Sequence, residues 1–169
     1  MAAKEPLIPF SAYDVDTVIA DIEAIRKFNP QRFEFEQLTA IVYEDAEEKA
    51  IVGYTDTSPD DFWVRGHMPG MPLMPGVLMC EAAAQLASYY VQKNDVMGCE
   101  MIGFGGLEGV RFRDFVRPGQ RLVIQCKQDK LRRGALIICR FQGYVNETRV
   151  VEGSIRGIPL PAEALRQIS

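Results

Sequence analysis

Residues 76–94 restrict the possible folds of this chain more than any other segment. They read GVLMCEAAAQLASYYVQKN, contain no proline and have high helix propensity, so they predict one helix about 28 Å long. The polar residues of this helix fall on one stripe, at Glu81, Gln85, Ser88 and Gln92. The rest of its surface is mostly apolar or small and requires burial.

Segments rich in β-branched and aromatic residues, or with alternating apolar and polar residues, predict strands on both sides of this helix. Before it, residues 33–44 and 49–57 flank an acidic turn, which predicts a hairpin. After it come four longer strands, expected at 101–114, 120–131, 135–145 and 149–158. The turns between these four strands are too short to contain crossover helices, so neighbouring strands should run antiparallel. Polar residues at alternate positions, such as Arg121, Gln125 and Gln142, indicate that one face of the sheet is wet.

One long helix and about six antiparallel strands predict an α+β domain in which the curved sheet wraps around the helix. We divide the chain into an N-terminal arm, residues 1–20, and one domain, residues 21–169. The domain should open with a short helix over 21–28, because Asn29-Pro30 would end it. Unpaired strand edges and leftover apolar surface favour a dimer.

Composition excludes several classes of function. The net charge of −4 argues against general binding to nucleic acid or anionic lipid. No apolar run is long enough for a signal peptide core or a membrane span, which predicts a soluble cytoplasmic protein. Four widely spaced cysteines and one histidine make a zinc site improbable, and we interpret the cysteines as reduced core thiols.

The one histidine of the chain begins the segment HMPGMPLMPGVLMCEAAAQ, residues 67–85. Three prolines stiffen the segment between His67 and the helix, and a catalytic base requires a backbone held in this way. Pro75 suits the first helical position, but neither Leu73 nor Met74 can cap the free amides that follow. Those amides could hold a ligand oxygen, and Gly76 has no side chain to block it.

Glu81 lies about a turn and a half inside the helix, and its side chain should lean back toward the same amides. In these apolar surroundings it could serve as a general acid. A base, an acid and an oxyanion stabiliser describe β-elimination or its reverse, but these features alone do not choose elimination over hydrolysis. A lone histidine is more often structural or solvated, and a glutamate such as Glu81, taken apart from the motif, more often extends to solvent or pairs with an arginine.

The segment resembles a motif of the 3-hydroxyacyl-acyl-carrier-protein dehydratases, H-F-P-G-x-P-x-M-P-G-V-x-x-x-E-x-x-A-Q, with the same His-to-Glu spacing of fourteen. DIEAIRKFNPQRFEF resembles the opening helix and L-P-H-R-Y-P-F segment of that family, and VRFRDFVRPGQRL resembles K-F-R-R-P-V-x-P-G-D-x-L. The resemblance covers about residues 21–158. Met68 replaces the usual Phe, Gln31 the His of P-H-R, and Glu34 the Pro after the aromatic residue.

The resemblance implies a hot-dog fold and an active site shared between the two protomers of a homodimer, possibly within a trimer of dimers. His67 would be the base and Glu81 of the opposite chain the acid. Gly76 and Val77 would bind the substrate, with the Gly76 amide on the thioester oxygen, and Gln85 would support Glu81. The implied partner is acyl carrier protein bearing the acyl-pantetheine substrate, and no metal or redox cofactor is expected. A related isomerising branch usually carries aspartate at the position of Glu81, so isomerase activity is less expected.

Two other functions stay open from the sequence. One is a hot-dog hydratase or thioesterase acting on coenzyme A esters, and the other is a non-catalytic acyl-binding module. A local basic patch could receive an acidic carrier protein, although ordinary solvated strand ends explain the same residues equally well. These residues are Arg111, Arg113, Arg117, Arg132 and Arg133.

Overall fold

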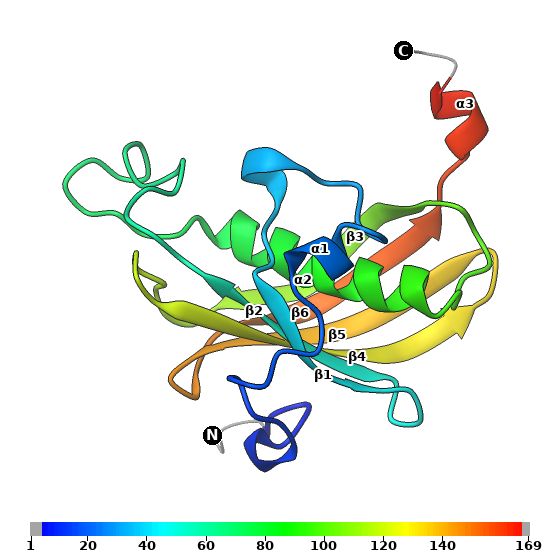
Figure 1. Cartoon of the computed structure of the whole chain (residues 1–169), viewed down its shortest axis with the longest axis horizontal. Coiled ribbons are helices and arrows are strands. Elements are labelled where there is room, and N and C mark those ends of the chain that lie inside the picture. The colour runs from blue at the N-terminus through cyan, green and yellow to red at the C-terminus, as the bar shows by residue number, and fades with distance from the viewer. Residues whose placement is uncertain (1–4, 167–169) are drawn as a thin grey trace.

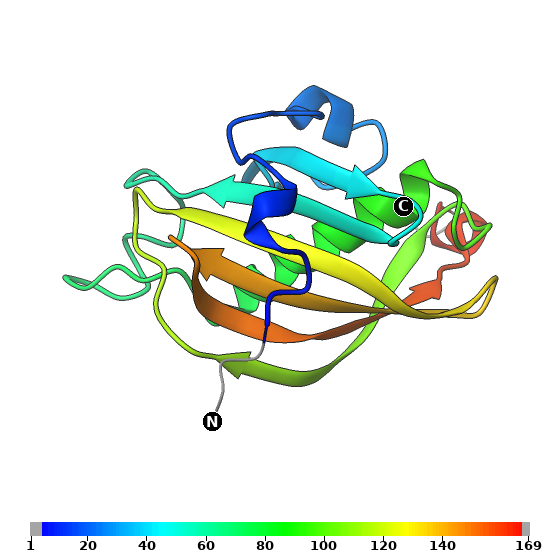
Figure 2. The same ribbon diagram turned by 90° about the horizontal axis from the view of Figure 1, so that it is seen from below.

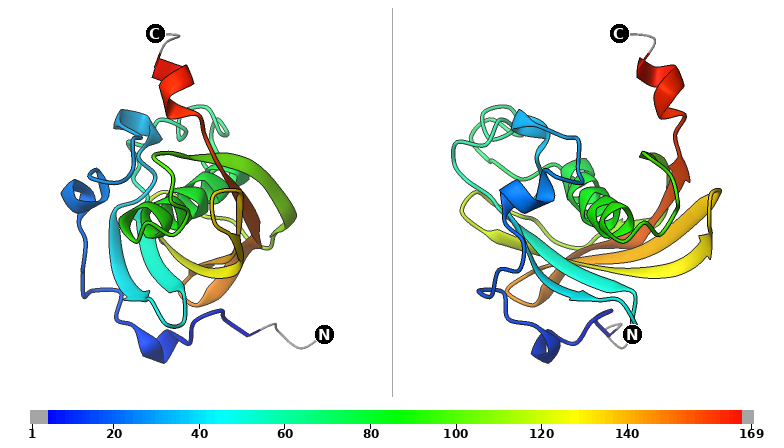
Figure 3. Two further views of the ribbon diagram at one scale, coloured as in Figure 1. Left: turned by 90° about the vertical axis from the view of Figure 1, so that its right-hand side faces the viewer. Right: turned by 45° about the vertical axis from the view of Figure 1, so that its right-hand side comes forward.

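The computed structural model describes residues 5–166 and consists of a curved antiparallel sheet wrapped around one long helix (Figures 1 and 3). The strands are β1 (Ala40–Asp45), β2 (Ala50–Asp56), β3 (Ile102–Phe112), β4 (Arg121–Arg132), β5 (Leu136–Val145) and β6 (Thr148–Pro159). The long helix is α2 (Gly76–Lys93), and the short helices are α1 (Ile22–Ile25) and α3 (Ala162–Arg166). Two 3₁₀ turns, η1 (Phe10–Ala12) and η2 (Phe33–Phe35), complete the elements. Residues 1–4 of the predicted arm and 167–169 of the predicted domain lie outside the described residues.

The sheet has the strand order β1-β2-β4-β5-β6-β3, and every neighbouring pair is antiparallel. The α+β class, the six strands and the wrapping around α2 are therefore confirmed. The β1 edge is partly covered, because Ala20 forms a bridge with Ile41. The β3 edge has no strand beside it among residues 5–166.

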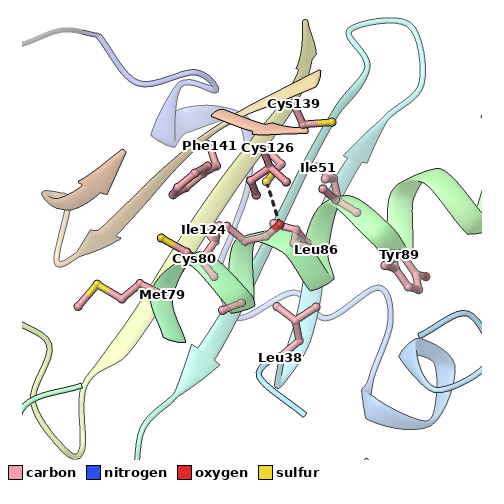
Figure 4. Packing of buried hydrophobic residues seen from close by; sticks show 14 of the residues in the cluster. Leu38, Ile51, Met79, Cys80, Leu86, Tyr89, Ile124, Cys126, Cys139 and Phe141 are labelled. Atoms are coloured by element: carbon pink, nitrogen blue, oxygen red, sulfur yellow. Dashed lines mark hydrogen bonds between the residues drawn. The ribbon is translucent and has the colours of Figure 1, made fainter. Parts of the chain in front are cut away.

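The core lies between α2 and the concave face of the sheet (Figure 4). Leu86 of α2 packs so closely on β2 that a Cβ on Gly53 would lie 2.9 Å from its Cδ1. Behind it, the Cys126 thiol of β4 contacts the Ala83 carbonyl at 3.6 Å. Small residues on both elements, Gly53 on β2 and Ala83 on α2, thus let the helix lie close to the sheet. The start of α2, at Gly76, lies beside Phe112 at the end of β3.

The segment before β1 differs from the sequence prediction. We expected a strand over 33–44, but residues 33–39 form η2 and a loop, and β1 starts only at Ala40. Phe33 has a φ of 58°, a left-handed conformation that a strand does not allow. The expected helix over 21–28 is shortened to α1, which Asp21 caps through a hydrogen bond from the Ala24 amide at 2.9 Å.

The outer face of the sheet was expected to be wet, and for its central part this prediction is wrong. Residues 5–13 cross this face (Figure 2). Gln125 is 0% exposed because its amide accepts from the Ile8 N–H at 3.0 Å and donates to the Ile8 carbonyl at 2.8 Å. Gln142, 4% exposed, accepts from the Leu7 N–H. Ile8 packs there on the outward side chains of β1 and β2, namely Ala40, Val42, Ala50, Val52 and Tyr54.

The cysteines are free, and three of them, Cys80, Cys126 and Cys139, are buried, as expected of core thiols. Burial raises the pKa of Cys80 to about 11 and that of Cys139 to about 12. Within residues 5–166 no helix is both long and apolar enough to cross a membrane. The cytoplasmic location stays a prediction.

Candidate active site

His67 lies in the loop that joins β2 to α2, and hydrogen bonds fix both its backbone and its ring. Its N–H donates to the Trp63 carbonyl at 2.8 Å, and its carbonyl accepts from the Leu73 N–H at 2.9 Å. Its ring Nδ1 lies 2.8 Å from the Leu73 carbonyl oxygen. A carbonyl only accepts, so Nδ1 carries the hydrogen and Nε2 of the neutral ring presents a lone pair. The exposed ring is thus arranged as a base.

The loop is anchored where it meets the helix. The Met74 N–H donates to the Val116 carbonyl at 2.8 Å, which ties the loop to the connection between β3 and β4. Met74, Val116 and Trp63 are all buried. The prolines predicted a stiff segment, and these tertiary contacts restrict its motion further.

The start of α2 has no side-chain cap, as the sequence indicated. Pro75 was expected at the first helical position, but it is the N-cap residue, and Gly76 is the first helical residue. A Cβ on Gly76 would lie 2.6 Å from the Phe112 ring, so the packing of Phe112 requires a glycine at this position. Val77 is 73% exposed. The first turn therefore presents amides beside an apolar side chain that this chain does not cover.

Glu81 is half-buried, and Gln85, which is 2% exposed, holds it. The Gln85 oxygen accepts from the Gln37 N–H at 2.9 Å, which fixes the orientation of the amide. Its NH₂ group donates to the Phe35 carbonyl at 2.6 Å and to Glu81 Oε1 at 2.8 Å. The bond from Gln85 engages Oε1 of Glu81 and leaves Oε2, the other carboxylate oxygen, outside it. The sequence predicted Gln85 behind Glu81, but it gave no signal for the two main-chain partners.

Glu81 and Gln85 line a cavity of about 220 Å³ between α2 and the end of the sheet formed by β3 and β6. Gln31 and Ser88 also line it, and Phe104 comes from β3. His67 is not part of this cavity, and no hydrogen bond joins it to Glu81 within residues 5–166. Within one chain, Glu81 and Gln85 therefore share a cavity whose lining does not include His67.

The five arginines considered as a basic patch do not form one surface. Arg133 bonds to Asp95, just beyond the C-terminal end of α2, at 2.7 Å. Arg111, Arg113 and Arg117 lie around the end of β3, whose Phe112 contacts the start of α2. Of these three, Arg113 pairs with Glu152 at 2.5 Å. A basic patch beside the site would thus consist only of the arginines at the end of β3.

Residues 5–166 contain no group of three or more His, Cys, Asp or Glu side chains placed to hold a metal ion. The expectation that no cofactor is needed stays a prediction.

Comparison with known proteins finds sequence relatives that match most of this chain. The model of the FabA-like domain matches residues 29–154. The 3-hydroxyacyl-[acyl-carrier-protein] dehydratase FabZ of Desulfotalea psychrophila is 34% identical over 138 residues, which cover 80% of this chain and 90% of that protein. The protein of the same name from Pelotomaculum thermopropionicum is 34% identical over 135 residues, covering 80% and 95%.

Solved structures support the fold. A chain of the dehydratase heterocomplex ApeI:P from Xenorhabdus doucetiae superposes with a TM-score of 0.68 at 15% identity, covering 86% of this chain and 97% of that one. The PaaI protein of Escherichia coli gives a TM-score of 0.56 at 11% identity, covering 70% and 80%. The likeness confirms the hot-dog fold.

Proposed function

This chain belongs to the FabA-like domain family, and on that premise we propose that it is a hydro-lyase that dehydrates 3-hydroxyacyl thioesters on acyl carrier protein to trans-2-enoyl thioesters in fatty-acid biosynthesis. The observation that carries the proposal is the bond from His67 Nδ1 to the Leu73 carbonyl, because it leaves Nε2 as the base. We assign the activity to residues 21–169 and treat residues 1–20 as an N-terminal arm, of which residues 5–13 pack on the outer face of the sheet.

The residues of the site divide the reaction between them. His67 Nε2 removes a proton from C2, and charge develops on the thioester oxygen, which the uncapped amide of Gly76 stabilises. Val77 follows Gly76 and borders the bound thioester. Glu81 Oε2 delivers its proton to the 3-hydroxyl as the C3–O bond breaks, while Gln85 holds Oε1. One water leaves, and a C2=C3 double bond remains.

The working site requires two chains, and we propose a homodimer that pairs along β3. Two observations support it: His67 does not line the Glu81 cavity of its own chain, and β3 has no neighbouring strand on its outer side in the described part of the chain. The large apolar side chains exposed on β3 are Phe104, Leu107 and Phe112. An exposed strand edge with apolar side chains favours pairing with another chain. Assembly into a trimer of dimers stays a prediction.

Acyl carrier protein is the substrate carrier that this function implies. Arg111 and Arg117 are exposed at the end of β3, beside the start of α2, where the thioester would enter. Acidic side chains of a carrier would be attracted to these guanidinium groups even though the chain as a whole is acidic.

Mass spectrometry of the product tests the proposed reaction. Purified protein is incubated with a 3-hydroxyacyl carrier-protein thioester, and the acyl group is weighed. Loss of one water supports dehydration. Release of the free acid would instead identify a thioesterase, and an unchanged acyl group would contradict both enzymes and leave an acyl-binding module.

A further inference from the structure

Two side-chain oxygens near Gln85, the residue that holds Glu81, are buried without a hydrogen-bond donor among the described residues. They are Asn29 Oδ1 and Gln31 Oε1. Both residues line a second, very small cavity of about 10 Å³, together with Gln85. A buried acceptor without a donor costs about 1–3 kcal/mol. Two acceptors facing one cavity cannot satisfy each other.

Asn29 has its orientation fixed. Its Nδ2 donates to the Gln85 carbonyl at 2.9 Å, so its oxygen must be the atom left without a donor. The same constraint does not apply to Gln31, because the oxygen and the NH₂ group of an amide have nearly the same size and shape. A rotation of about 180° about the last side-chain bond exchanges them.

This rotation would satisfy Asn29 and leave the Gln31 oxygen available to accept. The Gln31 NH₂ group would face the small cavity, where Asn29 Oδ1 needs a donor. The Gln31 oxygen would then turn to the other side of the side chain. Gln31 lines both the small cavity and the Glu81 cavity, so the rotated oxygen would face the Glu81 cavity.

We propose that Gln31, oriented in this way by Asn29, accepts a hydrogen bond from the 3-hydroxyl of the substrate and thereby selects 3-hydroxyacyl thioesters. The inference rests on the proposed dehydration. The hydroxyl oxygen must turn a lone pair toward the proton on Glu81 Oε2, so its own hydrogen needs another acceptor. Glu81 Oε1 already accepts from Gln85, whereas Gln31 Oε1 accepts from no donor among the described residues.

The proton balance is simple. The proton of Glu81 moves to the hydroxyl oxygen as the C3–O bond breaks. The original hydroxyl hydrogen stays on that oxygen and remains bonded to Gln31 in the departing water. Gln31 neither gains nor loses a proton, so it acts on the orientation and recognition of the hydroxyl.

Replacing Gln31 by an apolar residue of similar length tests the inference. In Gln31→Met we expect kcat/KM for a 3-hydroxyacyl carrier-protein thioester to fall about tenfold, the effect of one hydrogen bond. Inhibition by the saturated acyl thioester, which has no hydroxyl, should not change. The matched control is Gln92→Met, at the far end of the same helix face as Glu81, which should keep the wild-type kcat/KM.

Gln31→His provides a rescue. A neutral imidazole has one donor and one acceptor nitrogen, so it can serve Asn29 and the hydroxyl together, and kcat/KM should exceed that of Gln31→Met. A Gln31→Met enzyme with wild-type kcat/KM, or with equal loss of substrate turnover and inhibitor binding, would overturn the role of Gln31 alone. A wild-type protein that removes no water would overturn this role together with the proposed function.

Discussion

At the scale of single residues, the two proposed catalytic groups are each fixed by a bond that leaves one atom free for chemistry. The ring of His67 is held at Nδ1 by Leu73, which leaves Nε2. The carboxyl group of Glu81 is held at Oε1 by Gln85, which leaves Oε2. Holding a group at its inactive atom lowers the entropy that must be lost on reaching the transition state.

Removing either catalytic group should reduce turnover without disturbing the assembly. We expect His67→Ala and Glu81→Gln each to lower kcat for dehydration by about 100-fold or more, the size of general acid or base catalysis. Product mass spectrometry gives the rate, and size-exclusion chromatography with light scattering gives the oligomeric state. Near-normal turnover in either variant would refute the role of that residue.

Gln85 should matter for stability as well as for activity. Gln85→Leu leaves the buried Gln37 N–H and the Phe35 carbonyl without partners, so the free energy of unfolding should fall by about 1–3 kcal/mol. Urea denaturation measures this change. Ser88→Ala, one turn further along the same stripe, is the control and should change stability little. Equal stability of Gln85→Leu and wild type would show that these bonds contribute nothing.

The sequence predicted part of this site. The helical spacing of Glu81 and Gln85 places them on one face, and their contact follows from it. The backbone partners Phe35 and Gln37 could not be predicted, because they lie in a segment whose β-rich composition indicated a strand. The left-handed turn at Phe33 leaves no mark in that pattern.

At the scale of elements, strand positions were predicted to within one or two residues after the helix, as for 120–131 against Arg121–Arg132. Alternation of apolar and polar side chains and short polar turns were sufficient there. The covering of the outer face could not be predicted in this way. Alternation does not distinguish a glutamine that faces water from one, such as Gln125, whose amide pairs with a crossing backbone.

The crossing segment should stabilise the sheet without taking part in catalysis. Ile8→Ala removes a buried side chain on the face opposite α2, and we expect the free energy of unfolding to fall by about 2 kcal/mol or more. The rate of dehydration should stay normal. Val18→Ala, at an exposed position, is the control. An Ile8→Ala protein as stable as wild type would contradict the packing of this segment.

Glu152 on β6 should make stability depend on acid pH. Hydrogen bonds from Arg113, and then the charges of Arg113 and Arg149, lower its pKa below the ordinary value. The unfolded chain therefore binds a proton at higher pH than the folded one. The stabilisation is present above the unfolded pKa, near 4.3, and is lost as pH falls through the lower folded value.

Glu152→Gln removes this contribution. Its free energy of unfolding should be lower than that of wild type at pH 7, and the difference should shrink below about pH 4. Urea denaturation at several pH values measures it, with Glu47→Gln in the exposed β1–β2 turn as control. A constant difference at every pH would contradict the assignment of this titration to Glu152.

At the scale of the whole molecule, the proposed active site is shared between two chains. The Glu81 cavity lies beside β3, and His67 is not among the residues that line it. The wrapping of the sheet around one helix was predictable from the pattern of elements, whereas the hot-dog fold and the sharing of the site followed from the family resemblance. No local pattern reveals which side chains meet across two copies.

Mixing two inactive variants tests the shared site most directly. His67→Ala and Glu81→Gln protomers are co-expressed, and the mixed dimers are assayed for water loss. If histidine and glutamate come from different protomers, each mixed dimer has one site with both groups intact, and random pairing should restore about a quarter of wild-type activity. Activity no higher than that of the separate variants, although mixed dimers have formed, would contradict a site built from two chains.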